Sequence, residues 1–165
     1  MEFNVKKCKV MHLGFNNVEH SYFMEGHQLE VTEEERDIGV HVMKSLKQSA
    51  QCKKAARTAQ TVLSQISRAF HFRDRHVFLR LYVQYVRPHL EFASPAWSPW
   101  LEADKELLGR IQRRAVNMVS GLKAGTYEEK LKELGLTTLE ERRHQADMTQ
   151  VYKILTEKDM VKSDT

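Results

Sequence analysis

Cysteine and proline are scarce in this sequence, and long apolar runs are missing altogether. Its 165 residues include two cysteines and three prolines. Cys8 and Cys52 lie far apart and form no CxxC pair, so nothing indicates a disulfide framework or a zinc cluster. No apolar stretch approaches the ~20 residues that a membrane-spanning helix needs, and the start MEFNVKKCKV lacks the apolar segment of a signal peptide. We therefore expect no membrane contact and a location inside the cell, in the cytoplasm or the nucleus.

Paired carboxylates are also absent. The sequence has no Asp-Asp pair and no Asp-x-Asp run, whereas two-metal phosphoryl transfer needs close carboxylates that hold both ions. Residues 33–35 are three glutamates, but consecutive side chains point in different directions and make a poor cation site. The histidines show no metal-ligand spacing, and no nucleophile elbow or phosphate loop is present. We predict no catalytic site, no metal site, no cofactor and no small-molecule substrate.

Residues 1–45 have the pattern of a small β region. A short strand is predicted for residues 9–13, and a hairpin for residues 22–24 and 27–31 with its turn at Glu25-Gly26. Residues 36–43 predict one more strand, preceded by an acidic turn at residues 33–35. This segment is expected to form a β-hairpin remnant in front of a larger helical part.

Residues 46–157 change to a helical period. About five helices are expected, over residues 49–70, 74–87, 104–120, 126–135 and 138–156. Asp74 is a predicted N-cap, Thr126 and Thr138 open capping boxes with a glutamate three residues later, and Gly121 is the predicted C-cap of the third helix. Pro88 should stop or kink the second helix near Arg87. The fold class is therefore α+β and mostly α: a small β-hairpin region, a helical bundle, and a frayed tail over residues 158–165.

Residues 88–100 contain all three prolines and both tryptophans. Prolines resist regular structure, but so many aromatics do not suit a solvated linker. We expect a packed connector in which Trp97 and Trp100 are hydrophobic anchors. The alternative is that these tryptophans stack on nucleic-acid bases.

Basic side chains form stripes on two of the predicted helices, in a chain with a formal net charge of +4. His76, Arg80, Gln84 and Arg87 recur at helical spacing on the second helix, as do Arg110, Arg113, Arg114 and Asn117 on the third. Such stripes can follow a phosphate backbone, although a solvated helix face has the same pattern. Lys53, Lys54, Arg57, Arg142 and Arg143 strengthen the nucleic-acid interpretation if the faces converge in space.

Six ordered segments cover nearly the whole chain: NVKKCKVMHLG, EERDIGVHV, ISRAFHFRD, LYVQYVRPHLEFASPAWSPW, IQRRAVNMVSGL and YEEKLKELGLTTLEERR. Together they resemble the C-terminal part of the reverse transcriptases of non-LTR retrotransposons of the jockey and chicken-repeat groups. The resemblance implies that residues 1–45 correspond to the end of the palm and residues 46–157 to the helical thumb and its extension. The catalytic Asp-Asp turn of the family would precede the first of these segments.

The resemblance also implies a function. The family carries a lysine near the incoming nucleotide, and Lys7 is the position that we match to it, with Lys6 or Lys9 as the alternatives. The thumb grips an RNA-DNA or DNA duplex through its backbone, which makes Arg80, Arg87, Arg110, Arg113 and Arg114 the expected nucleic-acid-binding residues. The chain would be a truncated piece of an RNA-directed DNA polymerase that binds primer-template weakly, whose partners are the missing palm and fingers and whose parent enzyme uses Mg²⁺. The alternative is a helical protein-interaction module without a nucleic-acid role.

Overall fold

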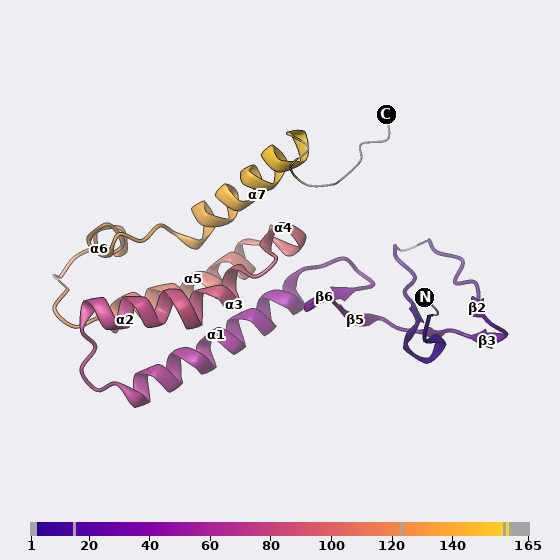
Figure 1. Cartoon of the computed structure of the whole chain (residues 1–165), viewed down its shortest axis with the longest axis horizontal. Helices are drawn as coiled ribbons and strands as arrows, with labels where there is room; N and C mark the ends of the chain where they lie inside the picture. Colours follow the sequence, from indigo (N-terminus) through magenta and orange to yellow (C-terminus); the bar gives the residue numbers. More distant parts are fainter. Residues whose placement is uncertain (1–2, 15, 123, 157, 159–165) are drawn as a thin grey trace. The chain divides into compact units, whose positions relative to one another are not determined.

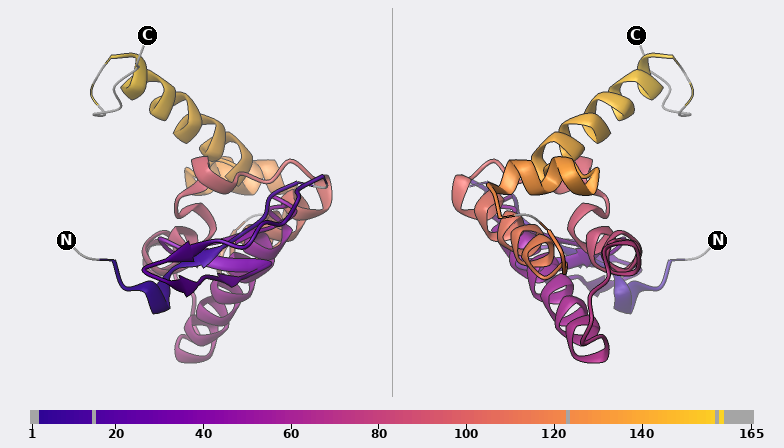
Figure 2. Two further views of the ribbon diagram at one scale, coloured as in Figure 1. Left: turned by 90° about the vertical axis from the view of Figure 1, so that its right-hand side faces the viewer. Right: turned by 90° about the vertical axis from the view of Figure 1, so that its left-hand side faces the viewer.

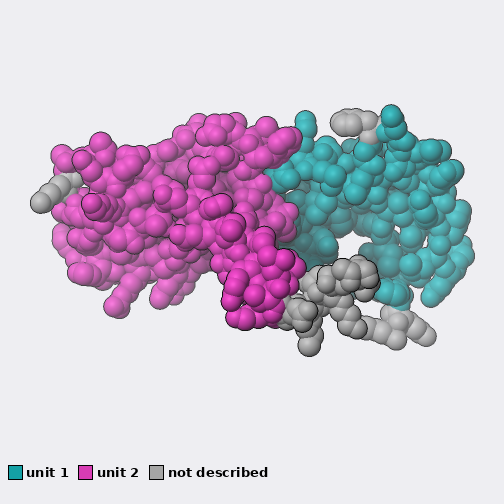
Figure 3. Space-filling view, turned by 90° about the horizontal axis from the view of Figure 1, so that it is seen from above, with its two compact units in different colours: residues 1–51 teal, residues 52–165 magenta. Residues whose placement is uncertain are grey.

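Short strands come first along the chain and helices follow (Figure 1), which confirms the predicted α+β, mostly α class. The computed structural model describes residues 3–14, 16–122, 124–156 and 158. The chain divides into two compact units, residues 1–51 and residues 52–165 (Figure 3), and each unit is described by itself.

The first unit consists of a 3₁₀ turn and three pairs of short strands. The turn η1 covers Val5–Lys7, and the strands are β1 (Lys9–Val10), β2 (Phe23–Met24), β3 (His27–Gln28), β4 (Glu30–Val31), β5 (Glu34–Asp37) and β6 (Val40–Met43). β1 pairs with β4 in parallel, whereas β2 with β3 and β5 with β6 form antiparallel hairpins. The predicted hairpin at Glu25-Gly26 is present.

Residues 36–43 are not the single strand that was predicted. They belong to the β5–β6 hairpin, whose turn places Ile38 at φ 44° and Gly39 at φ 88°. Two positive φ values in succession suit a two-residue hairpin turn. A β-branched residue such as isoleucine rarely adopts this conformation, so its sequence favours a continuous strand. Of the acidic residues 33–35 that were predicted to form a turn, Glu34 and Glu35 are the first two residues of strand β5.

The first unit buries few side chains. Among its described residues, His12 and Gln51 are buried, and the Oε1 of Gln51 accepts a hydrogen bond from the backbone N–H of His41 at 3.0 Å. Large apolar side chains, including Phe3, Val18 and Phe23, are exposed. Backbone pairing, more than apolar burial, therefore organises this unit.

The second unit is helical. Its elements are α1 (Ser49–Ala69), which begins at the end of the first unit, α2 (Arg75–Leu81), the π-helical segment η2 (Tyr82–Val86), α3 (Arg87–Glu91), α4 (Ser94–Trp97), α5 (Glu102–Asn117), α6 (Tyr127–Leu134) and α7 (Leu139–Leu155). No helix in the described part of the chain is both long and apolar enough to cross a membrane. The core is built from buried side chains of every helix: Cys52, Ala55, Ala59 and Leu63 of α1, Phe78, Tyr82, Val86 and Leu90 of α2 to α3, and Trp97, Leu108, Ile111, Leu131, Leu134 and Leu139.

The second predicted helix does not stop at Arg87. It continues through Pro88 to Glu91, and a π-helical turn precedes the proline. The N–H of Arg87 donates to the carbonyl of Tyr82, five residues earlier. A proline ring clashes with the carbonyl four residues before it in a regular helix, and the wider π turn provides the room.

The π turn also changes which residues share a face. Phe78, Tyr82, Val86 and Leu90 are all buried at intervals of four. An interval of 3.6 residues would turn Leu90 about 120° away from Phe78. The extra residue of the π turn restores the alignment, so the apolar row stays continuous. The same change removes Arg87 from the predicted face that it was to share with Arg80.

The proline-rich connector is packed at one of its two tryptophans. Trp97 is 2% exposed, and its Nε1 donates to the carbonyl of Phe92 at 2.6 Å. Trp100 is 70% exposed, so the prediction that it anchors the connector was wrong. The connector also contains the short helix α4, where irregular structure was expected. Ala93, at φ 50°, turns the chain between α3 and α4.

Three helices begin at their predicted capping residues. Asp74 caps α2, and both capping boxes are present at Thr126 with Glu129 and at Thr138 with Glu141. α5 ends at Asn117 with Met118 as its C-cap, so the prediction of Gly121 at this place was wrong. Figure 2 shows α7 extending away from the other helices of its unit. Of the tail predicted for residues 158–165, all but Lys158 lies outside the described residues.

Candidate nucleic-acid interface

Helix α1 presents an exposed basic face. Its 21 residues, SAQCKKAARTAQTVLSQISRA, include Lys53, Lys54, Arg57 and Arg68 and no aspartate or glutamate. All four cationic side chains are exposed. At ~100° per residue they lie within an arc of about 100°. We call these four residues the α1 basic face.

The α1 basic face is free of internal charge pairing. None of its four cations takes part in an ion pair with a described residue. The side chains between them are short or neutral, such as Thr58, Thr61 and Gln65, while the opposite side of α1 is buried in the core. The face is therefore a row of uncompensated positive charge on a rigid support.

The five arginines predicted to bind nucleic acid have different environments. Arg80 on α2 and Arg114 on α5 are exposed and have no ion-pair partner within the described ranges. Arg110 is also exposed, although its Nε lies 3.4 Å from the carboxylate of Glu106. These three side chains are able to reach a ligand in solvent.

The other two predicted arginines are less exposed and lie beside carboxylates. Arg87 is half-buried, and its Nε lies 3.7 Å from Glu91. Arg113 forms an ion pair with Glu106, and its guanidinium lies over the ring of Tyr127, 5.7 Å from the ring centroid. Their charges are partly neutralised within the fold.

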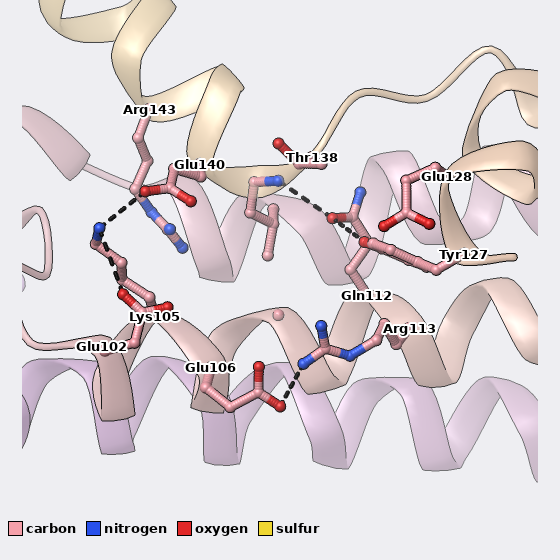
Figure 4. Close-up of a pocket in the computed structure, with 12 residues that line it drawn as sticks. Glu102, Lys105, Glu106, Gln112, Arg113, Tyr127, Glu128, Thr138, Glu140 and Arg143 are labelled. Atoms are coloured by element: carbon pink, nitrogen blue, oxygen red, sulfur yellow. Dashed lines mark hydrogen bonds and ion pairs between the residues drawn. The ribbon is translucent and has the colours of Figure 1, made fainter.

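A polar groove of about 240 Å³ lies between α5, α6 and α7 (Figure 4). Its centre is Gln112, a buried side chain. The Nε2 of Gln112 donates to the carbonyl of Thr137 at 2.9 Å, and its Oε1 accepts from the hydroxyl of Tyr127 at 2.9 Å and from the backbone N–H of Leu139 at 3.2 Å. Burial raises the pKa of Tyr127 to about 12, so its hydroxyl stays a donor at neutral pH. Gln112 thus joins α5 to the start of both following helices.

Charges of both signs line this groove. Lys105 bridges Glu140 at 2.8 Å and Glu102 at 3.8 Å. Arg143 is 5% exposed, and its pKa is lowered because burial disfavours the charged guanidinium. The lining contains four glutamates against one lysine and two arginines. The groove therefore offers no positive surplus for a phosphate, and its role is to hold the helices together.

A second ion-pair cluster fixes α7 to α3. The carboxylate of Glu91 receives two hydrogen bonds from Arg142, one of them from Nη2 at 3.0 Å, and the same hydrogen bonding raises the pKa of Arg142. Bidentate arginine pairs of this kind define orientation as well as distance. Arg142 is consequently structural and Arg143 is buried, so neither extends the α1 basic face.

Lys7, the position matched to a nucleotide-proximal lysine, is exposed at the end of η1. Within the described ranges no group of three or more His, Cys, Asp or Glu side chains is placed to hold a metal ion.

Cys52 lies on the buried side of α1 at 0% exposure, and burial first and then Asp104 raise the pKa of its thiol to about 11. Because the thiolate is the nucleophile, we expect iodoacetamide at pH 8 to modify Cys52 about 10²-fold more slowly in the folded chain than in denaturant, where a thiol has a pKa near 8.5. Mass spectrometry of pulse-labelled peptides measures both rates. Cys8, which is less buried, is the internal control, and equal slowing of both thiols or of neither would contradict the burial of Cys52.

Two features of this surface were not predicted. Arg68 was not assigned to any stripe, and Lys53, Lys54 and Arg57 were treated only as supporting charge. The sequence signal for these four residues is the lack of acidic residues in α1, because the other long helices, α5 and α7, contain both acidic and basic residues. The exposure of residues 70–72, in the loop after α1, was not predicted either.

Comparisons with known proteins give no match to this chain. No protein-family model, no curated protein and no solved structure matches it.

Proposed function

We propose that the helical unit binds the sugar-phosphate backbone of nucleic acid, weakly and without catalysis, as the resemblance to a non-LTR reverse transcriptase thumb implies. The observation that carries this proposal is the α1 basic face, whose four exposed cations form no ion pair with any residue that the structure describes. We assign no catalytic step to the chain, since its sequence has no carboxylate pair for two metal ions.

The dimensions of the face suit a phosphate backbone. Lys53 and Arg68 are fifteen residues apart in one helix, which corresponds to about 22 Å at a rise of 1.5 Å per residue. Each strand of a duplex carries one phosphate per ~3.4 Å of helix axis, so the face is about as long as six nucleotides of a duplex strand. Four cations over this length neutralise a strand at intervals and position it without reading its bases.

Three of the predicted arginines are exposed enough to contact nucleic acid, but they differ in their ion pairing. Arg80 and Arg114 are exposed and unpaired among the described residues, and Arg110 is exposed beside Glu106. We propose that these three contact phosphates outside the α1 basic face, and that Arg87 and Arg113 position helices instead. The partner is an RNA-DNA or DNA duplex or its strands, together with the remainder of the polymerase, whose Mg²⁺ site Lys7 would adjoin.

The test is the salt dependence of binding. A fluorescently labelled 20-nucleotide oligonucleotide, single-stranded or paired, is titrated with the full chain between 50 and 200 mM NaCl. With seven phosphate contacts, four on the α1 basic face and three from Arg80, Arg110 and Arg114, the slope of log K against log salt is expected near −5 for a single strand and near −6 for a duplex. Undetectable binding at 50 mM salt, or a slope near zero, would overturn the proposal.

A second candidate function, a protein-interaction module, is favoured by one observation on α7. Met148, Val151, Tyr152 and Leu155 are exposed, and their spacing of three, one and three residues places them on one face. Apolar association of this kind is insensitive to the salt that screens phosphate contacts. Undetectable nucleic-acid binding, together with a salt-insensitive self-association that Val151→Ser and Leu155→Ser abolish, would favour this second candidate. Salt-dependent nucleic-acid binding that these two substitutions leave unchanged would favour the first.

A further inference from the structure

The loop between α1 and α2 carries two exposed phenylalanines. Phe72 is 78% exposed and Phe70 is 40% exposed, and His71 between them is exposed as well. Burying a phenylalanine side chain is worth about 1.5–3 kcal/mol. Phe72 does not gain this burial free energy, although the loop follows a helix that is buried on one side. Its ring is therefore available to contact a ligand.

The residues that follow Phe72 in this loop are fixed by hydrogen bonds to neighbouring elements. The Nη2 of Arg73 donates to the Oγ of Ser67 at 2.9 Å, and the carbonyl of Arg73 accepts from the N–H of Ser120 at 3.0 Å. The carboxylate of Asp74 caps α2 through the N–H groups of His76 and Val77. The residues that follow Phe72 are thus fixed to α1, to the chain after α5 and to α2, and the ring projects from an anchored turn.

The surroundings of the loop are basic. Arg68, the last member of the α1 basic face, precedes Phe70 by two residues, and His76 and Arg80 follow on the exposed side of α2. The one acidic side chain within the loop, Asp74, is occupied as the helix cap, and Arg75 pairs with Glu133 at 3.7 Å. The exposed aromatic rings therefore stand at the end of a row of positive charge.

We propose that Phe72, assisted by Phe70, stacks on unpaired bases of a single strand whose phosphates lie along the α1 basic face. The inference rests on the proposed function and specifies its substrate as single-stranded nucleic acid. A positive track that binds the backbone, combined with aromatic rings that stack on bases, is the arrangement that single strands require. The bases of an intact duplex are already stacked on one another and offer the ring no open face except at the ends.

An anionic membrane is the other polyanion that attracts basic residues next to exposed rings. Membrane-surface helices keep a wide apolar face available for the lipid. The apolar side of α1 is instead buried in the core, and its exposed side carries threonine and glutamine between the cations. The charge and the polarity of this surface thus favour a strand of nucleic acid.

The experiment uses the full chain and two labelled probes, an oligo-dT of 20 nucleotides and a blunt 20-base-pair duplex. Phe72→Ala is expected to weaken binding of oligo-dT roughly tenfold and to leave binding of the blunt duplex unchanged. The salt slope should stay the same, because no charge is removed. Phe72→Trp should retain affinity for oligo-dT, and its added fluorescence should be quenched on binding, a signal that a merely structural effect does not produce.

Phe3→Ala is the matched control, because Phe3 is a phenylalanine of similar exposure, 75%, outside the loop. It should leave both affinities unchanged. If the wild-type chain binds both probes and Phe72→Ala binds oligo-dT equally well, or loses both probes equally, the stacking inference is overturned and backbone binding stands. If the wild-type chain binds neither probe at 50 mM salt, the proposed function itself fails. Binding to anionic phosphatidylserine vesicles that depends on Phe72, with oligo-dT affinity intact, would also overturn the inference.

Discussion

Replacing the four residues of the α1 basic face with glutamine is expected to weaken nucleic-acid binding about 10²-fold at 0.1 M salt. The variant combines Lys53→Gln, Lys54→Gln, Arg57→Gln and Arg68→Gln. Each lost phosphate contact removes the release of nearly one counterion, so the salt slope should fall by about 3 at the same time. Glutamine has a helix propensity close to that of lysine and arginine, so α1 itself should stay folded. Fluorescence anisotropy over a salt series measures the affinity and the slope together.

A control with the same loss of charge separates a specific face from general attraction. Lys6, Lys47, Lys132 and Lys153 are all exposed and lie outside α1. Their simultaneous replacement by glutamine should reduce affinity less than tenfold and leave the salt slope almost unchanged. Equal effects of the two quadruple variants would mean that net charge alone attracts the ligand, and the α1 basic face would lose its assigned role.

The second large effect concerns stability. Gln112→Leu is expected to lower the free energy of unfolding by about 3 kcal/mol, because each buried polar group left without a partner costs about 1–3 kcal/mol. The substitution preserves most of the side-chain volume but deprives the Tyr127 hydroxyl, the N–H of Leu139 and the carbonyl of Thr137 of their partner. The open groove lets water reach part of this cluster, which keeps the expected loss below the sum of three such costs. Urea unfolding followed by circular dichroism measures the change.

Gln145→Leu is a suitable control for that measurement, since Gln145 is exposed on α7 and its side chain forms no hydrogen bond with another described residue. Its effect should stay within about 0.5 kcal/mol. A double-mutant cycle between Gln112→Leu and Tyr127→Phe should then show coupling of about 1 kcal/mol, since the two side chains share one hydrogen bond. A loss at Gln112 no larger than that at Gln145 would contradict the role of Gln112 as the link between α5, α6 and α7.

Local signals predicted the helix starts well. The cap at Asp74 and the two capping boxes need only residues within one turn, and each one forms as predicted. The buried side of α1 also follows directly from the spacing of its small and apolar residues. The same residues imply the opposite, basic face, because a helix that buries one side must expose the other.

Features that depend on a neighbouring element were predicted less well. Trp97 and Trp100 have similar local sequences, yet one is buried and the other is exposed. Arg110 and Arg114 remain accessible, whereas Arg113 turns towards Glu106 and Tyr127. Neither difference can be read from spacing, since each depends on the position of a side chain that is distant in sequence or on another helix.

The π turn shows the same distinction in one helix. Sequence patterns predicted a helix here and an interruption of its regular hydrogen bonding at Pro88. Both can be predicted because the proline ring and its missing N–H are local properties. Whether the chain would stop, bend or widen depended on the core, where Phe78, Tyr82, Val86 and Leu90 gain burial together if one extra residue is inserted. The amino-acid sequence thus specifies the helices, their caps and the acid-free surface of α1. The tertiary structure decides which arginines stay exposed and which of the two tryptophans is buried. The physical reason is that a side chain gains burial free energy only from residues that the fold brings next to it.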